Sequence, residues 1–185
     1  MDGDQVLAKI LKAEGVEWIS CFPAQTLINA CSVEGIRPVM CRQERAGVNM
    51  ADGFSRIRRG RTNGVFAAQA GPGIANAFPG IAHAFAENVP MPVLPARQSL
   101  TRQYKHPTFS AGDVYGPVTK WAARAHSVDE LPELMRRAYH AMRTGKGGPV
   151  LIEVPAEVWE ADFTGDLDYD PVVPYRAAPD PDAVR

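Results

Sequence analysis

The chain has 185 residues, of which 45% are apolar and 22% charged, a composition that excludes a disordered, collagen-like or coiled-coil protein. A chain of this length builds one ordinary domain with a sizeable core. The formal net charge of −1 lacks the basic excess of a dedicated nucleic-acid binder, so we expect no nucleic-acid partner. No apolar run approaches the length of a membrane span, and the acidic residues 1–4 are unlike a signal peptide. We therefore expect a cytoplasmic protein without membrane contact.

Apolar periodicity, with glycine and proline between the periodic segments, predicts alternating helices and strands. Helices are predicted over residues 4–14, 26–32, 44–59, 74–87 and 128–143. Strands are predicted over residues 16–22, 38–41, 64–68, 92–95, 120–125 and 150–154. This alternation is typical of an α/β fold with a doubly wound, mainly parallel sheet and helices on both faces, a three-layer sandwich of the flavodoxin or Rossmann kind.

Three local features qualify this pattern. Asp4 is expected to cap the first helix, and Gly15 to end it. Pro79 and Gly80 lie inside the helix expected over residues 74–87 and predict a kink or a broken start. Residues 96–117 are polar and are expected to form a long irregular loop, which in a compact domain is usually functional or mobile.

The last part of the chain has the composition of a linker. Residues 160–185 contain seven acidic residues, two basic residues and four prolines. We therefore expect a folded domain over residues 1–159 and an acidic, Pro-rich linker over residues 160–185. The start of a further helix at Asp180-Pro181-Asp182 favours a middle domain beyond this linker.

The cysteines and histidines do not have the spacing of a metal site. The cysteines are odd in number and include no C-x-x-C pair, which is typical of reduced thiols. The histidines are scattered and have no carboxylate at a ligand spacing. We therefore predict no metal site and no disulfide among these residues: Cys21, Cys31, Cys41, His83, His106, His126 and His140.

Three segments that follow predicted strands have side chains suited to a binding site. They are Cys21-Phe22-Pro23-Ala24, Arg42-Gln43-Glu44-Arg45-Ala46-Gly47 and Gly71-Pro72-Gly73-Ile74-Ala75-Asn76. Carboxyl ends of parallel strands lie at one edge of the sheet, where open α/β folds bind their ligands. We therefore expect the three segments to converge on one cleft.

Each segment also has a purely structural interpretation. The glycine-rich segment is a tight turn in which Asn76 bonds the local backbone. It is not the dinucleotide-binding fingerprint, because Asn76 occupies the third glycine position and Pro72 lacks an amide hydrogen. A glutamate such as Glu44 in a first helical turn is favoured by the helix dipole. The dipole equally explains the arginines near the end of the same helix: Arg56, Arg58, Arg59 and Arg61.

Together the segments resemble the N-terminal, pyrimidine-binding domain of thiamine diphosphate enzymes of the acetolactate synthase and benzoylformate decarboxylase type. The resemblance runs from about Asp4 to Val158. Its pieces occur in the family's order: Gly15-Val16, then Cys21-Phe22-Pro23-Ala24 in place of G-x-P-G, then Gln43-Glu44 with Ala51-Asp52-Gly53-Phe54-Ser55-Arg56, then Gly71-Pro72-Gly73 with Asn76, then Val118-Thr119-Lys120-Trp121, then Gly148-Pro149-Val150 with Glu153-Val154-Pro155.

The resemblance implies a lyase or transferase that uses thiamine diphosphate and acts on a 2-keto acid. In such enzymes a glutamate of this domain hydrogen-bonds a ring nitrogen of the aminopyrimidine and so activates the cofactor. By its position Glu44 matches that glutamate and is the predicted catalytic residue. Pro23 and Ala24 would pack beside the pyrimidine, and Pro72 and Asn76 would line the same cleft.

The resemblance also implies parts that lie outside this chain. The family holds the diphosphate and Mg²⁺ with a G-D-G…N motif on a separate domain, a motif that Asp52-Gly53 and Gly165-Asp166-Leu167 do not match. The active site would be completed by the diphosphate-binding domain of a second subunit, in a homodimer or homotetramer, and this chain alone would be inactive. FAD occurs in the family, but no residue here indicates it. Three small residues are expected to pack against a partner helix: Ala46, Gly47 and Ala51.

Some residues depart from the family's pattern. Phe109-Ser110-Ala111 stands where the synthases have F-Q-E, and Pro95-Ala96-Arg97-Gln98 replaces T-G-Q. Cys21 and Ala24 replace the glycines of G-x-P-G. These departures leave the donor and acceptor substrates open. They also support an alternative hypothesis, in which the chain is a non-catalytic interaction or regulatory module that retains the fold. A nucleotide-binding domain is disfavoured because the sequence contains no P-loop.

Overall fold

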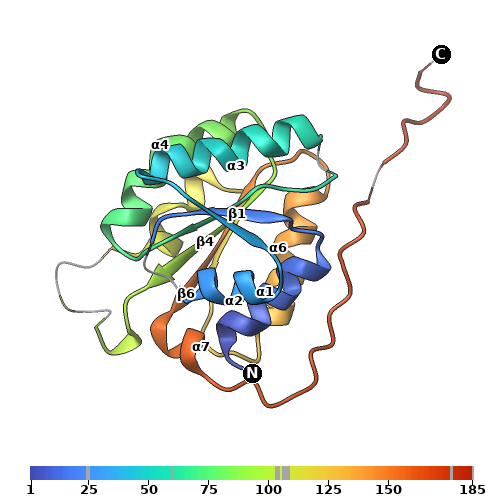
Figure 1. Ribbon diagram of the computed structural model, residues 1–185. Helices are drawn as coiled ribbons and strands as arrows, with labels where there is room; N and C mark the ends of the chain where they lie inside the picture. Colours follow the sequence, from blue (N-terminus) through green and yellow to red (C-terminus); the bar gives the residue numbers. More distant parts are fainter. Residues whose placement is uncertain (24–25, 60, 103–104, 106–108, 176, 185) are drawn as a thin grey trace.

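The computed structural model describes residues 1–23, 26–59, 61–102, 105, 109–175 and 177–184. Six strands form one sheet in the order β2-β1-β3-β4-β6-β5, and every neighbouring pair is parallel (Figure 1). The strands are β1 (Trp18–Cys21), β2 (Arg37–Met40), β3 (Val65–Ala68), β4 (Met91–Arg97), β5 (Trp121–Arg124) and β6 (Pro149–Pro155). The predicted doubly wound α/β fold is confirmed.

Helices cover both faces of the sheet. On one face lie α3 (Glu44–Arg58) and α4 (Pro72–Ala86), with the short α5 (Ala111–Val114) beside them. On the other face lie α1 (Gly3–Ala13), α2 (Leu27–Val33), α6 (Leu131–Arg143) and the short α7 (Ala156–Glu160) (Figure 1). Two 3-10 turns, η1 (Leu100–Arg102) and η2 (Gly116–Val118), complete the elements.

The central strand β3 shows why the sheet has a core on each side. All four of its residues are buried. Successive side chains of a strand point to opposite faces, so Val65 and Ala67 enter one core while Phe66 and Ala68 enter the other. A strand buried on both faces is apolar throughout, as parallel sheets require.

Two helix starts differ from their predictions. Asp2, not Asp4, is the N-cap of α1, and the Gln5 side chain accepts a hydrogen bond from the Asp2 amide at 3.1 Å, which completes a capping box. The helix α4 begins earlier than predicted, with Pro72 in its first turn, and is not broken at Pro79. Pro79 lies on the exposed side of α4, where solvent can satisfy the carbonyl that loses its N–H partner.

The segment predicted as one long irregular loop over residues 96–117 contains short elements in its described parts, whereas residues 103–104 and 106–108 lie outside the described residues. Strand β4 continues to Arg97, η1 and α5 follow within the segment, and η2 begins at its end. The three cysteines are free and buried. None of the helices described in the structure is long and apolar enough to cross a membrane.

Residues 161–172 pack against the domain before the chain leaves it. Partly buried side chains of this segment contact the core cluster that α1 and α6 share: Ala161, Phe163, Leu167, Tyr169 and Val172. The Tyr169 hydroxyl donates a 2.6 Å hydrogen bond to Glu14, at the end of α1. The boundary after residue 159 stays a prediction, and this packing extends the ordered contacts about one dozen residues beyond it.

Candidate functional site

The three predicted segments meet at one edge of the sheet. Strand β1 has β2 on one side and β3 on the other, so the order of the strands reverses between β1 and β3. Ligands of open α/β sheets bind outside the carboxyl ends of the strands at such a point. The segments after β1, β2 and β3 are those that contain Pro23, Glu44 and Asn76.

The first turns of α3 lie directly against the sheet and so fix Glu44 at its edge. The buried Ser20 hydroxyl of β1 donates a 2.7 Å hydrogen bond to the Gly47 carbonyl. Gly47 has no room for a side chain, because a Cβ there would lie 2.7 Å from Phe66 Cε2 and 2.9 Å from Cys41 Sγ. Glu44, the first residue of α3, is consequently only 7% exposed.

This packing corrects the expected role of the small residues of α3. Gly47 and Ala51 are buried in the chain's own core and do not face outward, whereas Ala46 is exposed. Of the three small residues, only Ala46 therefore remains available to a partner helix.

The first turn of α4 is placed against Glu44 by a sharp turn after β3. Gly71 has a φ of +68°, a conformation that glycine adopts at no steric cost. The Ile74 amide donates a 3.1 Å hydrogen bond back to the Gln69 carbonyl. A Cβ on Gly73 would lie 3.3 Å from Glu44 Oε1, so the carboxylate and the backbone of this turn are direct neighbours.

Asn76 orients the Glu44 carboxylate. Its Nδ2 donates a 2.6 Å hydrogen bond to Glu44 Oε2, instead of bonding the local backbone as the structural interpretation of the turn had it. Among the described residues, Glu44 Oε1 accepts no side-chain hydrogen bond and faces Gly73. One carboxylate oxygen is thus held by Asn76, and the other faces the backbone of the 71–73 turn.

The other predicted site residues are only partly tied to this pair. Pro72 is exposed in the first turn of α4, next to Gly73. Pro23 is exposed after the end of β1, and no described contact joins it to Glu44. Ala24 lies outside the described residues. The structure therefore brings Glu44, Asn76 and the 71–73 turn together, and the contribution of Pro23 remains a prediction.

The thiols near the site are not activated. Burial raises the pKa of Cys21 to about 11 and raises that of Cys41 above its ordinary value. A thiol with a raised pKa is protonated at neutral pH and is a poor nucleophile. The described residues also contain no group of three or more His, Cys, Asp or Glu side chains arranged to hold a metal ion.

Several other residues of the resemblance have structural tasks in α3. Arg56 Nε donates to Asp52 Oδ1 at 2.7 Å, one helical turn away. The Ser55 hydroxyl accepts a 2.9 Å hydrogen bond from the Gly64 amide, which ties α3 to the start of β3. Arg58 pairs with Glu17 at 2.6 Å. Two of the four arginines noted in the sequence, Arg56 and Arg58, thus form ion pairs within the chain.

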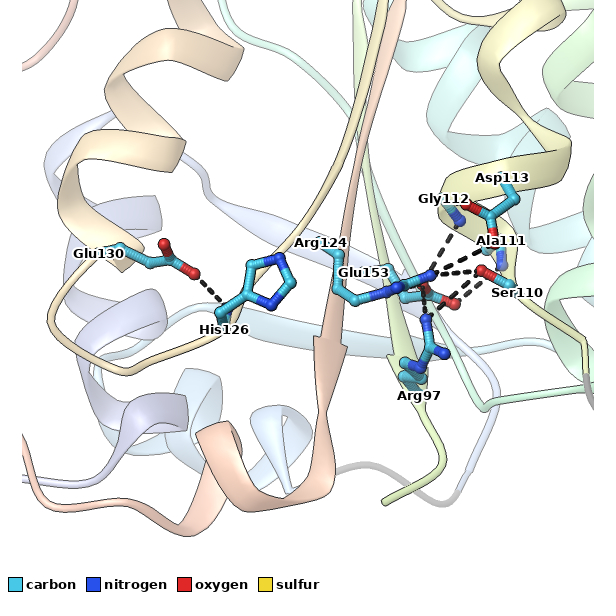
Figure 2. Close-up of polar contacts among 9 residues, drawn as sticks. All are labelled: Arg97, Ser110, Ala111, Gly112, Asp113, Arg124, His126, Glu130 and Glu153. Carbon is cyan, nitrogen blue, oxygen red and sulfur yellow. Dashed lines mark hydrogen bonds and ion pairs between the residues drawn. The ribbon is translucent and has the colours of Figure 1, made fainter. Parts of the chain in front are cut away.

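A second polar cluster lies at the carboxyl ends of β4, β5 and β6 and was missed in the sequence. Glu153 of β6 is 1% exposed and lies 2.9 Å from the Arg97 guanidinium of β4 and 3.1 Å from that of Arg124 in β5 (Figure 2). A glutamate inside an apolar strand was the available signal, because a buried charge needs a partner. The partners themselves are distant in sequence.

Comparisons with known proteins agree on one family. Residues 1–114 match the family model described as "Thiamine pyrophosphate enzyme, N-terminal TPP binding domain". The acetolactate synthase large subunit of Haemophilus influenzae is 27% identical over an alignment 184 residues long, which covers 96% of this chain and 32% of that protein. The probable acetolactate synthase large subunit of Methanocaldococcus jannaschii is 31% identical over 93% of this chain and 29% of its own.

Two further similar proteins have names other than acetolactate synthase. The glyoxylate carboligase of Escherichia coli O157:H7 is 30% identical over 78% of this chain and 25% of its own length. The crystal structure of benzoylformate decarboxylase from Polynucleobacter necessarius superposes with a TM-score of 0.86 at 23% identity, over all of this chain and 35% of that one. This likeness concerns the fold.

The chain spans about a third of the length of the curated relatives it matches first. The match of the family model covers more than half of the chain, and it includes Glu44, Asn76 and the 71–73 turn. The chain therefore belongs to the family of N-terminal thiamine pyrophosphate-binding domains of thiamine pyrophosphate enzymes.

Proposed function

We propose that this chain holds and activates the aminopyrimidine of thiamine diphosphate in a 2-keto acid carboligase or decarboxylase. Glu44 is the catalytic residue in this proposal. The observation that carries it is the buried Glu44 carboxylate, oriented by Asn76 at 2.6 Å, at the point where the order of the strands reverses. Membership of the family implies the cofactor.

The residues at this edge fit the pyrimidine part of the cofactor. An aminopyrimidine offers ring nitrogens that accept a hydrogen bond and an exocyclic amine that donates one. A carboxyl group can donate to a ring nitrogen when protonated, and Glu44 Oε1 is the oxygen that Asn76 leaves available. Pro72, exposed beside it, supplies an apolar wall for a flat ring.

Each residue has a separate task in the proposed reaction. Thiamine diphosphate, when bound, supplies the electron sink for breaking or making a bond next to a carbonyl group. Glu44 holds and moves a proton at Oε1, a general acid–base role for a carboxyl placed within hydrogen-bond reach. Asn76 fixes the orientation of the carboxyl, and the buried setting of Glu44 limits access of water.

The diphosphate and Mg²⁺ are assigned in this proposal to a separate domain, supplied by a second subunit of a homodimer or homotetramer. The composition of α4 supports a partner on this side of the molecule. From Pro72 to Ala86 the helix contains no Asp, Glu, Lys or Arg, although Pro72, Pro79 and His83 are exposed. Solvent-exposed helix faces usually carry charges.

The test is Glu44→Gln in the assembled enzyme that contains this chain, with Glu133→Gln on the exposed side of α6 as the control. We expect turnover of 2-keto acids to fall at least about a hundredfold in Glu44→Gln and to stay unchanged in the control. A loss within about tenfold, or ~1.4 kcal/mol of barrier, would remove Glu44 from the catalytic role. Failure of the wild type to bind thiamine diphosphate with Mg²⁺ would favour the non-catalytic module.

A further inference from the structure

The Glu153 cluster consists of Arg97, Ser110, Asp113, Arg124 and Glu153 and joins three strands to one short helix (Figure 2). The side chains of Arg97 and Glu153 are 6% and 1% exposed. A buried ion pair is often no more stabilising than well-packed apolar residues of the same volume. The cluster therefore needs an explanation other than stability alone.

The Glu153 carboxylate also binds the backbone of the first turn of α5. Oε1 accepts a 2.8 Å hydrogen bond from the Ala111 amide, and Oε2 accepts a longer one of 3.4 Å from the Gly112 amide. Ser110, the N-cap of α5, accepts a 2.6 Å hydrogen bond from Arg124 through its hydroxyl. Glu153 and the two arginines together fasten the start of α5 to the sheet.

Tyr115, the residue that follows α5, connects this helix to the candidate site. Tyr115 is fully buried, and its hydroxyl donates a 2.5 Å hydrogen bond to the Ile74 carbonyl. Its ring also packs against Phe78 of α4, with 5.2 Å between ring centroids. Ile74 follows Gly73, the neighbour of Glu44 Oε1, and precedes Asn76, the donor to Glu44 Oε2, by two residues.

We propose that Glu153 is a positioning residue for the Glu44–Asn76 pair, acting through α5 and Tyr115 on the first turn of α4. Its effect on catalysis rests on the function proposed above, but the mechanical connection does not. The contacts run without a gap from Glu153 to Ala111, along α5 to Tyr115, and from Tyr115 to Ile74. A mispositioned carboxyl loses most of its benefit to a reaction, because proton transfer depends on sub-ångström placement.

Two variants separate this connection from a general loss of stability. Glu153→Gln keeps the size of the side chain but removes the charge that faces the buried Arg97, and it leaves Arg124 with only the exposed Asp113 at 3.5 Å. Tyr115→Phe removes only the hydroxyl that bonds Ile74 and leaves the Glu153 cluster intact. If the connection exists, both variants increase hydrogen exchange in the first turn of α4. The double variant then exchanges there little faster than either single variant.

The chain offers a matched control at the opposite edge of the sheet. Glu14, at the end of α1, is also a buried carboxylate that pairs with a largely buried arginine, Arg143. It also accepts hydrogen bonds from Tyr169 and from the Val172 amide. Glu14→Gln disturbs an equally buried ion pair that, within the described part of the chain, forms no hydrogen bond or ion pair with α4 or α5.

The first measurement is hydrogen exchange of the full chain without ligand, read at the amides of residues 73–77. We expect exchange there to be about tenfold faster in Glu153→Gln and Tyr115→Phe than in the wild type, and unchanged in Glu14→Gln. Equal exchange at residues 73–77 in all three variants and the wild type would overturn the proposal. So would an equal acceleration in Glu14→Gln, because that result indicates only lower global stability.

The second measurement is the affinity of the assembled enzyme for thiamine diphosphate with Mg²⁺, together with kcat. We expect Glu153→Gln to lose about tenfold or more in one of these, relative to Glu14→Gln at the same temperature. If the two variants exchange faster in α4 but the wild-type enzyme does not bind the cofactor, the proposed function is overturned and the connection from Glu153 to α4 stands. Cofactor binding and turnover like those of Glu14→Gln, with unchanged exchange in α4, would overturn the connection alone.

Discussion

Asn76 and Glu44 are 32 residues apart in the chain, yet Asn76 Nδ2 lies 2.6 Å from Glu44 Oε2. The hydrogen bond joins the first turns of α3 and α4, which follow β2 and β3, the two strands on either side of β1. Both helix N-termini favour a negative charge, so the carboxylate is held by an amide donor and by two helix dipoles. This geometry has a measurable consequence for stability.

We expect Asn76→Ala to lower the free energy of unfolding by about 1 kcal/mol, because the Glu44 carboxylate loses a hydrogen bond and Asn76 itself is exposed. Asn76→Asp is expected to cost more, because it places a second carboxylate against the first. Urea unfolding of the chain measures both. Asn29→Ala, at an exposed asparagine of α2, is the control, and an equal effect there would contradict the prediction.

Two glycines of α3 are expected to respond in opposite ways to alanine. A Cβ at Gly47 would meet Phe66 and Cys41 at less than 3 Å, so Gly47→Ala should destabilise the chain by about 1–3 kcal/mol. A Cβ at Gly53 would have no neighbour within 4 Å among the described residues, so Gly53→Ala should stabilise the helix by up to about 1 kcal/mol. Urea midpoints of the two variants measure the difference, and a shift in the same direction for both would contradict it.

Alkaline pH should destabilise the chain through its buried thiols. Burial raises the pKa of Cys21 from 9.0 to about 11 and that of Cys31 from 9.0 to about 12. The folded state thus keeps protons that the unfolded state releases. The stability that this difference contributes is complete below about pH 9 and is lost as the pH rises toward the two folded-state values. Burial also raises the pKa of Tyr115, which extends the effect to higher pH.

The expected size of this effect is up to about 1.4 kcal/mol per pH unit for each thiol above pH 9. Urea unfolding at pH 7.5, 9.5 and 10.5 measures it. Cys31→Ala should make the free energy of unfolding fall less steeply between pH 9.5 and pH 10.5, whatever its effect on stability at pH 7.5. A slope that is the same with and without Cys31 would show that this thiol is not protected in the folded state.

The attachment of residues 161–172 depends on Tyr169. Its hydroxyl donates to the buried carboxylate of Glu14, so Tyr169→Phe removes one of the hydrogen bonds that stabilise this buried charge. We expect a loss of about 1–2 kcal/mol and faster proteolytic cleavage within residues 161–172. Tyr175→Phe, at a tyrosine that is 68% exposed, is the control. Equal cleavage rates in the two variants would argue against an anchor at Tyr169.

The helices and strands, and their alternation, were predictable because they depend on consecutive residues. The apolar spacing in α1 and α6 and the short apolar runs in β3 and β6 place each element within a few residues of its position in the structure. Elements that depend on single residues were less predictable. Pro79 neither breaks nor ends α4, because the packing of the helix outweighs the loss of one hydrogen bond.

The sequence by itself also determined which residue types are present at the candidate site, through the ordered motifs around Glu44 and Asn76. Only the tertiary structure decided that these two side chains bond each other, that Gly47 faces the sheet, and that Glu153 gathers Arg97 and Arg124. The physical reason is that periodicity is a property of neighbours along the chain. A contact between distant residues depends instead on the order of the strands and the register of each helix on the sheet, which no local segment specifies.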